Sequence, residues 1–253
     1  MRNRFHLLLL LAGLGLGAPA FAGADDPVSL VLTYRARPEH RADFRSWVET
    51  EGAAQFAQWR REGVFRDCLL LFTTFATANP DLVVVLDFAR LADSGRWREI
   101  ERRRPGGLTP EALRYAAPES ASYGEAIAHG AAQRRDPARA AYLVITYAYT
   151  VDSATYRKYV AGYTVPQMED WIASGALTAY ALYLNHTPYN VPWESLLVLE
   201  YADLAGLARR DEIKAAARAR LNAADPVFKS YADAKAEIRR DLAMFHADAI
   251  PLP

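Results

Sequence analysis

The chain has 253 residues, of which 51% are hydrophobic and 24% are charged. This balance is typical of a globular protein with a core of its own, and it excludes disordered, collagen-like and coiled-coil proteins. Lys and Arg together number 30, as do Asp and Glu, so we expect no nucleic-acid partner. The one cysteine, Cys68, excludes a disulfide framework and a cysteine-rich metal site.

The first 24 residues have the pattern of a secretory signal peptide. Arg2 and Arg4 precede a short apolar run, and small residues then allow cleavage after Ala22 or after Ala24. The apolar run is too short to cross the roughly 30 Å hydrocarbon layer of a membrane. We therefore expect residues 1–24 to be removed as a signal peptide, and the mature chain to be periplasmic and not embedded in the membrane.

The remainder of the chain repeats itself with an offset of 112 or 113 residues. The segment LVLTY at 30–34 recurs as LVITY at 143–147, and the segments that follow match at the same offset. Self-similarity at a constant offset is the signature of a repeated structural unit. The sequence therefore predicts a tandem duplication, with a first repeat at 25–135 and a second repeat at 136–253.

Each repeat opens with a strand and a helix. Residues 28–36 and 141–149 are rich in Val, Leu, Thr and Tyr, which favours strands. A segment with aromatic residues at helical spacing follows in each repeat. Gly52 interrupts it in the first repeat, and Gly162 and Pro166 interrupt it in the second, so the sequence predicts a kinked or divided helix.

Two further strands and another helix follow in each repeat. The strands are expected at 66–74 and 82–88 in the first repeat and at 178–186 and 195–201 in the second, and the helices at 91–103 and 203–221. The last part of each repeat, at 109–132 and 225–245, also has apolar residues at helical spacing. This spacing predicts a final helix. Neither repeat shows a convincing fourth strand, so the sequence leaves open whether a fourth strand closes each repeat.

The predicted strands are apolar on both faces instead of alternating between polar and apolar residues. One face therefore meets helices, and the other meets a second dry surface, for which the sheet of the other repeat is the simplest choice. The sequence predicts an α+β fold of two ferredoxin-like repeats, each with the order strand-helix-strand-strand-helix. Their antiparallel sheets pack as a pseudo-dimeric barrel or sandwich with the helices outside.

This duplicated order of elements resembles the dimeric α+β barrel superfamily, which includes antibiotic-biosynthesis monooxygenases, EthD-like proteins and NIPSNAP-like proteins. The resemblance is carried by the opening strands at 30–34 and 143–147 and by the aromatic helices that end in Trp59 and Gly63 and in Trp171 and Gly175. It implies a cleft for a small molecule between the sheets or beneath the helices, but no particular reaction. It also implies either a monomer that contains an internal pseudo-dimer or a homodimer.

His186 is the candidate catalytic residue. It ends the second strand of the second repeat, where the first repeat has Thr74, and a duplicated scaffold can specialise where its copies differ. The ordinary pKa of histidine, about 6.5, suits a general base or a haem ligand. The alternative interpretation is structural, with His186 capping the strand and bonding to a loop carbonyl.

Six further residues are candidates for contact with a ligand. Tyrosines crowd the second repeat, where they suit an aromatic-lined pocket but also fill the space between a sheet and its helices. The predicted ligand-binding residues are Asn185, Tyr183, Tyr147, Tyr149, Thr33 and Thr146. No metal site is expected, because no histidines or carboxylates stand at ligand spacing. Arg-rich stretches such as Arg209-Arg210 are interpreted as solvated helix faces.

These observations predict an exported periplasmic barrel protein that binds a small, largely apolar or aromatic molecule without a tightly held cofactor. Such a protein could be a cofactor-independent, monooxygenase-like or isomerase-like enzyme. The first alternative is a non-catalytic envelope interaction or stress protein. The second alternative is a haem-binding barrel, with His186 as the iron ligand.

Overall fold

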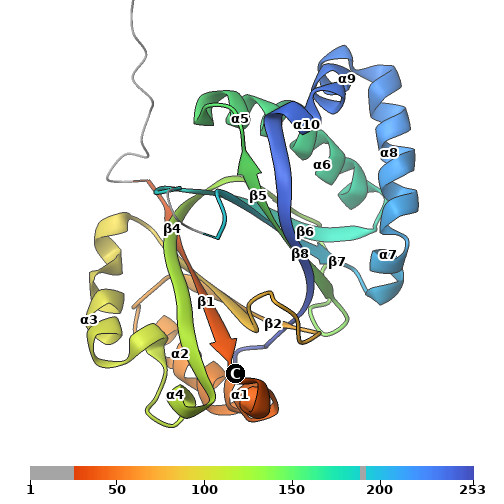
Figure 1. Ribbon diagram of the computed structural model, residues 1–253. Helices are drawn as coiled ribbons and strands as arrows, with labels where there is room; N and C mark the ends of the chain where they lie inside the picture. Colours follow the sequence, from red (N-terminus) through yellow and green to blue (C-terminus); the bar gives the residue numbers. More distant parts are fainter. Residues whose placement is uncertain (1–25, 189–191) are drawn as a thin grey trace, which may run out of the picture.

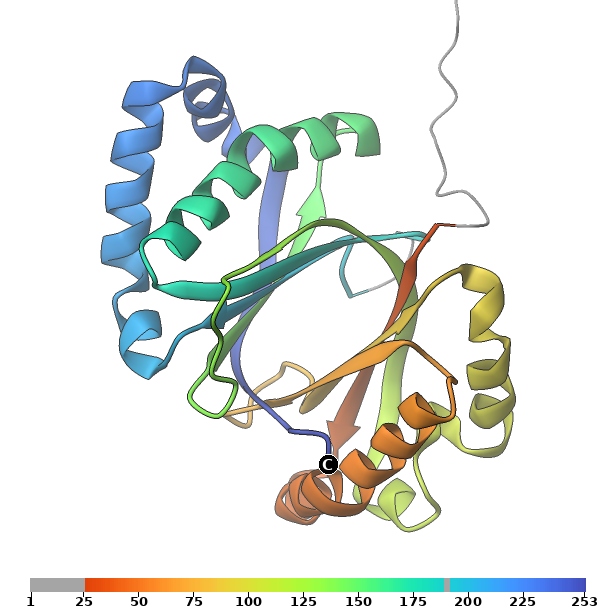
Figure 2. The same ribbon diagram turned by 180° about the vertical axis from the view of Figure 1, so that it is seen from behind.

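A computed structural model describes residues 26–188 and 192–253, so the predicted signal peptide lies outside the described residues. Eight strands form one closed antiparallel barrel in the order β1-β3-β2-β8-β5-β7-β6-β4. Helices pack on the outside of the barrel in two groups on opposite sides (Figure 1 and Figure 2). The predicted α+β fold with outer helices is thereby confirmed. Within the described ranges, no helix has the length and hydropathy needed to cross a membrane.

The first half of the chain contributes four strands and four α-helices. Their bounds are β1 Val28–Ala36, α1 Arg41–Trp47, α2 Ala53–Arg61, β2 Asp67–Thr73, β3 Leu82–Phe88, α3 Gly95–Arg103, α4 Ala112–Tyr115 and β4 Ala116–Ala131. The three strands expected from the sequence are therefore confirmed to within one residue at each end.

The second half repeats this order with more helix near its end. Its elements are β5 Ala141–Tyr149, α5 Ser153–Tyr159, α6 Val165–Ala173, β6 Leu177–Asn185, β7 Ser195–Tyr201, α7 Leu204–Ala208, α8 Arg210–Ala224, α9 Pro226–Asp233, α10 Lys235–Ile238 and β8 Arg239–Ala249. The long helix α8 lies along the outside of this half (Figure 1).

The expected interruption of the first helix in each half takes the form of a π-helical segment. Val48–Gly52 joins α1 to α2, and Val160–Thr164 joins α5 to α6. In a π-helical segment the backbone hydrogen bonds span one residue more than in an α-helix. The helix geometry therefore changes at this segment, but the chain stays helical. Pro166, which has no backbone N–H to donate, is the second residue of α6, directly after the π-helical segment.

The prediction of final helices at 109–132 and 225–245 was wrong. The first region is mostly β4, and the second contains the short helices α9 and α10 and then β8. β4 pairs with β1 of its own half and with β6 of the other, and β8 pairs with β5 and with β2. Each fourth strand thus closes the barrel by bonding to strands far away in sequence.

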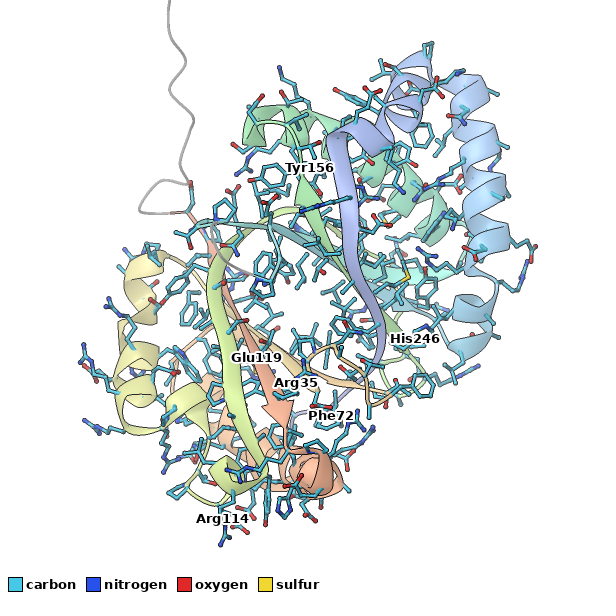
Figure 3. All side chains as sticks on the ribbon, viewed as in Figure 1. Arg35, Phe72, Arg114, Glu119, Tyr156 and His246 are labelled. Atoms are coloured by element: carbon cyan, nitrogen blue, oxygen red, sulfur yellow. The ribbon has the colours of Figure 1, made fainter. Side chains whose placement is uncertain are left out.

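Local sequence gives little sign of these two strands. β4 reads AAPESASYGEAIAHGA and holds few of the branched and aromatic residues that favour strands. Both of its edges are nevertheless paired, and Arg35 of β1 forms an ion pair with Glu119 of β4 at 3.1 Å (Figure 3). In β8, a bulge at Leu242 shifts the strand's alternation, which helps its apolar residues imitate helical spacing.

The apolar residues divide into three clusters, two outside the barrel and one inside. Each outer cluster lies between one half's sheet and its own helices. The inner cluster combines side chains from both halves, including Val31, Leu71, Val83, Tyr142, Val144, Trp193 and Phe245. Apolar side chains from both halves therefore form a core inside the barrel, and this explains why the strands are apolar on both faces.

Candidate functional site

Four of the predicted site residues belong to the side of the strands that faces the barrel interior. Tyr183 is part of the inner cluster, and strand alternation places Thr33, Thr146 and Asn185 on the same side. Thr33 bonds to the hydroxyl of Ser120 at 2.8 Å. Each of the four is buried, and burial raises the pKa of the Tyr183 phenol.

The amide of Asn185 shapes the turn that follows β6. Its Nδ2 donates to the carbonyl of Trp193 at 3.1 Å, and its Oδ1 accepts from the backbone N–H of Thr187 at 2.9 Å. Both ends of the amide are thus used within the chain. Through these two hydrogen bonds Asn185 stabilises the turn after β6.

His186 lies directly after β6, beside β4. Its backbone N–H donates to the carbonyl of Tyr123 at 2.9 Å. Its Nε2 is buried and has no hydrogen-bond partner within the described part of the chain. Burial lowers the pKa of the imidazole, the charge of Arg157 lowers it further, and Glu125 opposes them. None of the described cavities is lined by His186, so its catalytic role stays a prediction.

Tyr147 and Tyr149 point to the other face of the sheet, toward the helices of the second half. Tyr149 stacks on Tyr156 of α5, which is labelled in Figure 3, with ring centroids 4.7 Å apart. Tyr147 lines a cavity beneath α6 and α8. The seven predicted residues therefore do not converge on one site, and Tyr147 is the one among them that reaches this cavity.

The cavity has a volume of about 140 Å³ and lies between the outer face of β5, β7 and β8 and the helices α6, α8 and α10. One part of its wall is apolar. This part consists of Ile145, Met168, Trp171, Leu197, Leu199 and Met244. Tyr163, Thr164 and Gln167 complete the side formed by the π-helical segment and α6.

The rest of the wall is strongly cationic. Arg210, Lys214 and Arg218 are spaced four residues apart on α8, so they share one face of that helix. Lys235 of α10 and Arg239 of β8 add two more positive charges. Asp241 is the sole acidic residue among the lining residues. We call this cavity the cationic pocket.

Arg239 is the most deeply buried of these cations. It is 8% exposed, and its guanidinium carbon lies 3.7 Å from the centroid of the Tyr147 ring. Its Nε and Nη1 atoms are buried and make no hydrogen bond of regular geometry within residues 26–188 and 192–253, although the side chains of Tyr147, Tyr156 and Tyr159 lie near the guanidinium. A buried charge whose donors are unpaired is costly, so it marks a place where an acceptor would bind favourably.

Other hydrogen-bond donors around the cationic pocket are also buried and unpaired among the described residues. Thr164 Oγ1, Trp171 Nε1 and Arg210 Nε are buried without a partner among the described residues. By contrast, Arg218 Nε donates to Gln167 Oε1 at 2.8 Å, and Lys214 Nζ pairs with Asp211 at 2.5 Å. The pocket therefore offers several free donors, most of them positively charged, to a small acceptor.

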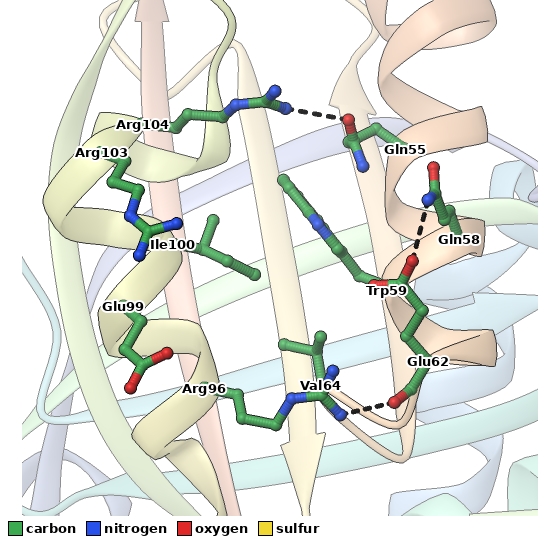
Figure 4. Close-up of a pocket in the computed structure, with 10 residues that line it drawn as sticks. All are labelled: Gln55, Gln58, Trp59, Glu62, Val64, Arg96, Glu99, Ile100, Arg103 and Arg104. Carbon is green, nitrogen blue, oxygen red and sulfur yellow. Dashed lines mark hydrogen bonds between the residues drawn. The ribbon is translucent and has the colours of Figure 1, made fainter.

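The equivalent position in the first half has an open cleft with a different character. This cleft of about 520 Å³ runs between α2 and α3 (Figure 4). Its charged residues are largely exposed and of both signs, namely Glu62, Glu99, Arg96, Arg103 and Arg104. Several of them bond within the cleft, as when Arg104 donates to Gln55 at 2.9 Å (Figure 4). It lacks the buried positive charge of the cationic pocket.

The sequence interpretation missed the residues that make the cationic pocket. Arg209 is exposed, as expected for a solvated helix face, but Arg210 turns inward and lines the cavity. Arg239 falls within the helix that the sequence predicts at 225–245. An alignment of the two repeats could have pointed to Arg210, because it places this arginine at the position of the apolar Trp97.

A haem does not fit the cationic pocket. Its 140 Å³ is below the roughly 300–1,000 Å³ of pockets for larger organic ligands, and no histidine or cysteine is among its lining residues. His186, the predicted iron ligand, lies elsewhere.

No protein-family model matches the chain, and no curated protein matches its sequence. Solved structures do share its fold. A proposed monooxygenase from Lactobacillus acidophilus NCFM has a TM-score of 0.54 and 10% identity, covering 89% of this chain and 95% of that one. A proposed monooxygenase from Fusobacterium nucleatum has a TM-score of 0.52 and 12% identity, covering 89% and 93%. An anthrone oxidase-like protein has a TM-score of 0.50 and 11% identity, covering 89% and 92%.

At such low identities this similarity establishes the fold and not the reaction. The chain shares the ferredoxin-like α+β barrel of these solved structures, closed within a single polypeptide. This confirms the architectural part of the expected resemblance.

Proposed function

We propose that the protein binds a small organic anion, a short carboxylic acid, in the cationic pocket. The observation that carries the proposal is the buried guanidinium of Arg239, which has no carboxylate partner among the described residues and whose Nε and Nη1 make no regular hydrogen bond there. Four more cations and one carboxylate line the same cavity. A carboxylate is the acceptor that a guanidinium binds best, through two parallel hydrogen bonds.

The size and the apolar wall of the pocket narrow the choice of ligand. A volume of 140 Å³ is the liquid volume of roughly five water molecules, so the ligand has only a few heavy atoms. Ile145, Met168 and Leu197 would cover its carbon skeleton, while the cations hold its acidic group. The sequence predicts a small, largely apolar or aromatic ligand. The ligand proposed here keeps the small size but is instead an acid on a short carbon chain.

We further propose that the protein acts in a bacterial periplasm after its signal peptide is removed. The supporting pattern is the positively charged start, the short apolar run and the small residues before Ala24. Binding of a small metabolite is compatible with the monooxygenase-like fold, and a non-catalytic envelope interaction protein is the alternative that the following experiment tests.

The test is calorimetric titration of the exported protein, isolated from the periplasm, with lactate, acetate, benzoate and inorganic phosphate. We expect one site for lactate or acetate, binding that weakens as salt rises, and little affinity for the larger benzoate. The mass of the isolated chain, cleaved after Ala22 or after Ala24, tests the proposed export in the same sample. An envelope interaction protein would bind none of these anions.

Arg239→Met is the decisive variant. It removes the buried charge but keeps an apolar side chain of similar length, so we expect the free protein to keep or gain stability while carboxylate binding is lost. The matched control is Arg240→Met, because Arg240 is the exposed neighbour of Arg239 on the same strand. Equal binding by the wild type and Arg239→Met would contradict the proposal.

A further inference from the structure

Lys235 differs from the other cations of the pocket in its contacts. It is the first residue of α10, the short helix that leads directly into β8 (Figure 1). Its side chain is half-buried and lines the cavity. Lys214 is held by Asp211, but Lys235 Nζ has no carboxylate oxygen within 4.0 Å in the described part of the chain. Lys235 therefore presents an amine that is not committed to an ion pair.

The surroundings of this amine favour its neutral form. Burial lowers the pKa of Lys235, and the positive charges of Arg239, Arg218 and Lys214 lower it further, while Asp241 opposes them. Arg210 on α8 adds another positive charge to the same cavity, and Tyr147 and Tyr163 face it from β5 and the π-helical segment. A neutral amine is the nucleophilic form of lysine and the form that attacks carbonyl groups.

The rest of the pocket suits a ligand that carries such a carbonyl. The guanidinium of Arg239 provides unpaired donors for a carboxylate, and Thr164 Oγ1 and Trp171 Nε1 provide buried uncharged donors. The apolar wall leaves room for a short carbon chain. A carboxylate bound to the guanidinium would hold an adjacent keto group within the same small cavity as the Lys235 amine.

We propose that Lys235 forms a Schiff base with a short keto acid whose carboxylate is held by Arg239. This inference rests on the anion site proposed above and gives it a chemical purpose. Lys235 Nζ attacks the carbonyl carbon, the C=O π bond breaks, and one amine proton passes to the oxygen to give a neutral carbinolamine. The second amine proton leaves with the hydroxyl group as one water molecule, and a C=N bond remains. No oxidant, reductant or further reactant is needed.

The composition of the chain makes this step easy to locate. It has four lysines among its 30 basic residues, namely Lys158, Lys214, Lys229 and Lys235. Lys229 is exposed and bonds to Asp233 on α9, outside the cationic pocket. Lys229 therefore reports the background reactivity of an ordinary lysine in the same experiment.

The test is reductive trapping of the full exported chain with pyruvate and cyanoborohydride, followed by intact-mass measurement and peptide mapping. We expect one carboxyethyl group per chain, located on Lys235 and formed severalfold faster than on Lys158 or Lys229. Lys229→Met should be labelled like the wild type. Lys235→Arg keeps the positive charge but lacks the nucleophile, so it should lose the trapped adduct.

Lactate separates failure of the Schiff base from failure of the anion site, because lactate has the carboxylate of pyruvate but no carbonyl. If lactate binds and pyruvate labels no lysine in preference, the Schiff base is overturned while the anion site stands. If lactate does not bind the wild type, the anion site itself is overturned. Labelling of Lys235→Arg at its remaining lysines to the wild-type extent would also overturn the assignment to Lys235.

Discussion

The two halves of the barrel use the same helix–sheet interface for opposite purposes. In the first half, Trp97 of α3 is 2% exposed and packs on Phe56, Trp59 and Phe65, with ring centroids between 5.6 and 6.4 Å apart. The alignment of the two repeats places Arg210 at the position of Trp97. One half therefore fills this space with an aromatic ring, and the other opens it and lines it with charge.

Strand pairing reveals a second position at which an apolar residue of the first half corresponds to an arginine of the second half. Ala116 of β4 pairs with Ala36, and Arg239 of β8 pairs with Tyr149, which is equivalent to Ala36 in the repeat. A small apolar residue of the first half is thus replaced by a buried arginine in the second.

The segment after the second helix of each half completes the contrast. In the first half, α3 ends and a turn at Gly106 and Gly107 follows, both residues with positive φ. A side chain on Gly107 would lie 2.8 Å from the Trp97 ring, and Gly106 accepts a 2.6 Å hydrogen bond from Tyr34 Oη. In the second half, α8 continues and carries Lys214 and Arg218 over the cavity. The first half therefore has a packed aromatic core at this interface, and the second half has a cavity lined with charge.

Placing a positive charge at the equivalent position of the first half tests this contrast between the halves most directly. Trp97→Arg would remove a fully packed aromatic side chain and bury a cation with no cavity to receive it. We expect a loss of about 3–5 kcal/mol in the free energy of unfolding, measured by urea denaturation. A loss below about 1 kcal/mol would show that the first half tolerates the charge as the second half does.

The reverse exchange should have a smaller effect on stability and a specific effect on binding. Arg210→Trp would place the first-half residue in the cationic pocket and fill part of it. We expect stability within about 1–2 kcal/mol of the wild type, together with loss of the stabilisation by lactate, which is about 2.7 kcal/mol at a ligand concentration of 100 Kd. Thermal unfolding with and without lactate measures both. Full retention of the lactate effect would separate the pocket from Arg210.

Two equivalent carboxylates offer a subtler comparison, at the ends of β3 and β7. Burial would raise the pKa of Glu200, but hydrogen bonds from Arg135, Tyr142 and Thr178 outweigh it and hold the pKa below its usual value. Burial raises the pKa of its counterpart, Asp87, with the charge of Asp67 adding to it, although Ser29 donates to Asp87 at 2.5 Å. The two groups therefore change stability with pH in opposite directions.

For Glu200 the stabilisation is complete above the pKa of the unfolded chain and is lost as the pH falls through the lowered pKa of the folded state. For Asp87 stability instead falls as the pH rises from the unfolded pKa through the raised folded pKa. Glu200→Gln should thus cost about 1.5–3 kcal/mol at neutral pH, whereas Asp87→Asn should be neutral or stabilising. Urea denaturation between acidic and neutral pH checks both, and equal losses for the two variants would contradict the assignment.

Much of the fold could be predicted because its signals are local. The strands at 28–36, 82–88, 141–149 and 195–201 match the structure to the residue, since runs of branched and aromatic residues favour strands wherever they pack. Trp59 and Trp171, expected at equivalent helical positions, are both buried. The fourth strands could not be predicted, because their pairing partners lie in other parts of the chain and their own residues carry little strand preference.

The candidate site was less predictable than the fold. The interpretation of Tyr147 as a ligand contact is compatible with its place in the cationic pocket, but Thr33, Thr146 and Tyr183 lie on the other side of the sheet. A one-residue step along a strand reverses the direction of a side chain, so the tyrosines at 147 and 183 reach different clusters.

Periodicity and residue type were enough to predict the first three strands of each half, the helices between them, the similarity of the two halves and the two-sided burial of the strands. The closure of the barrel and the clustering of positive charge in the cationic pocket depend instead on tertiary packing. Arg210 and Arg239 are separated along the chain by the rest of α8 and by the two short helices α9 and α10, and each looks like an ordinary surface arginine in the sequence. They line one cavity because α8 packs over the sheet and β8 closes the barrel beneath it, and long-range packing of this kind leaves no mark in the local sequence.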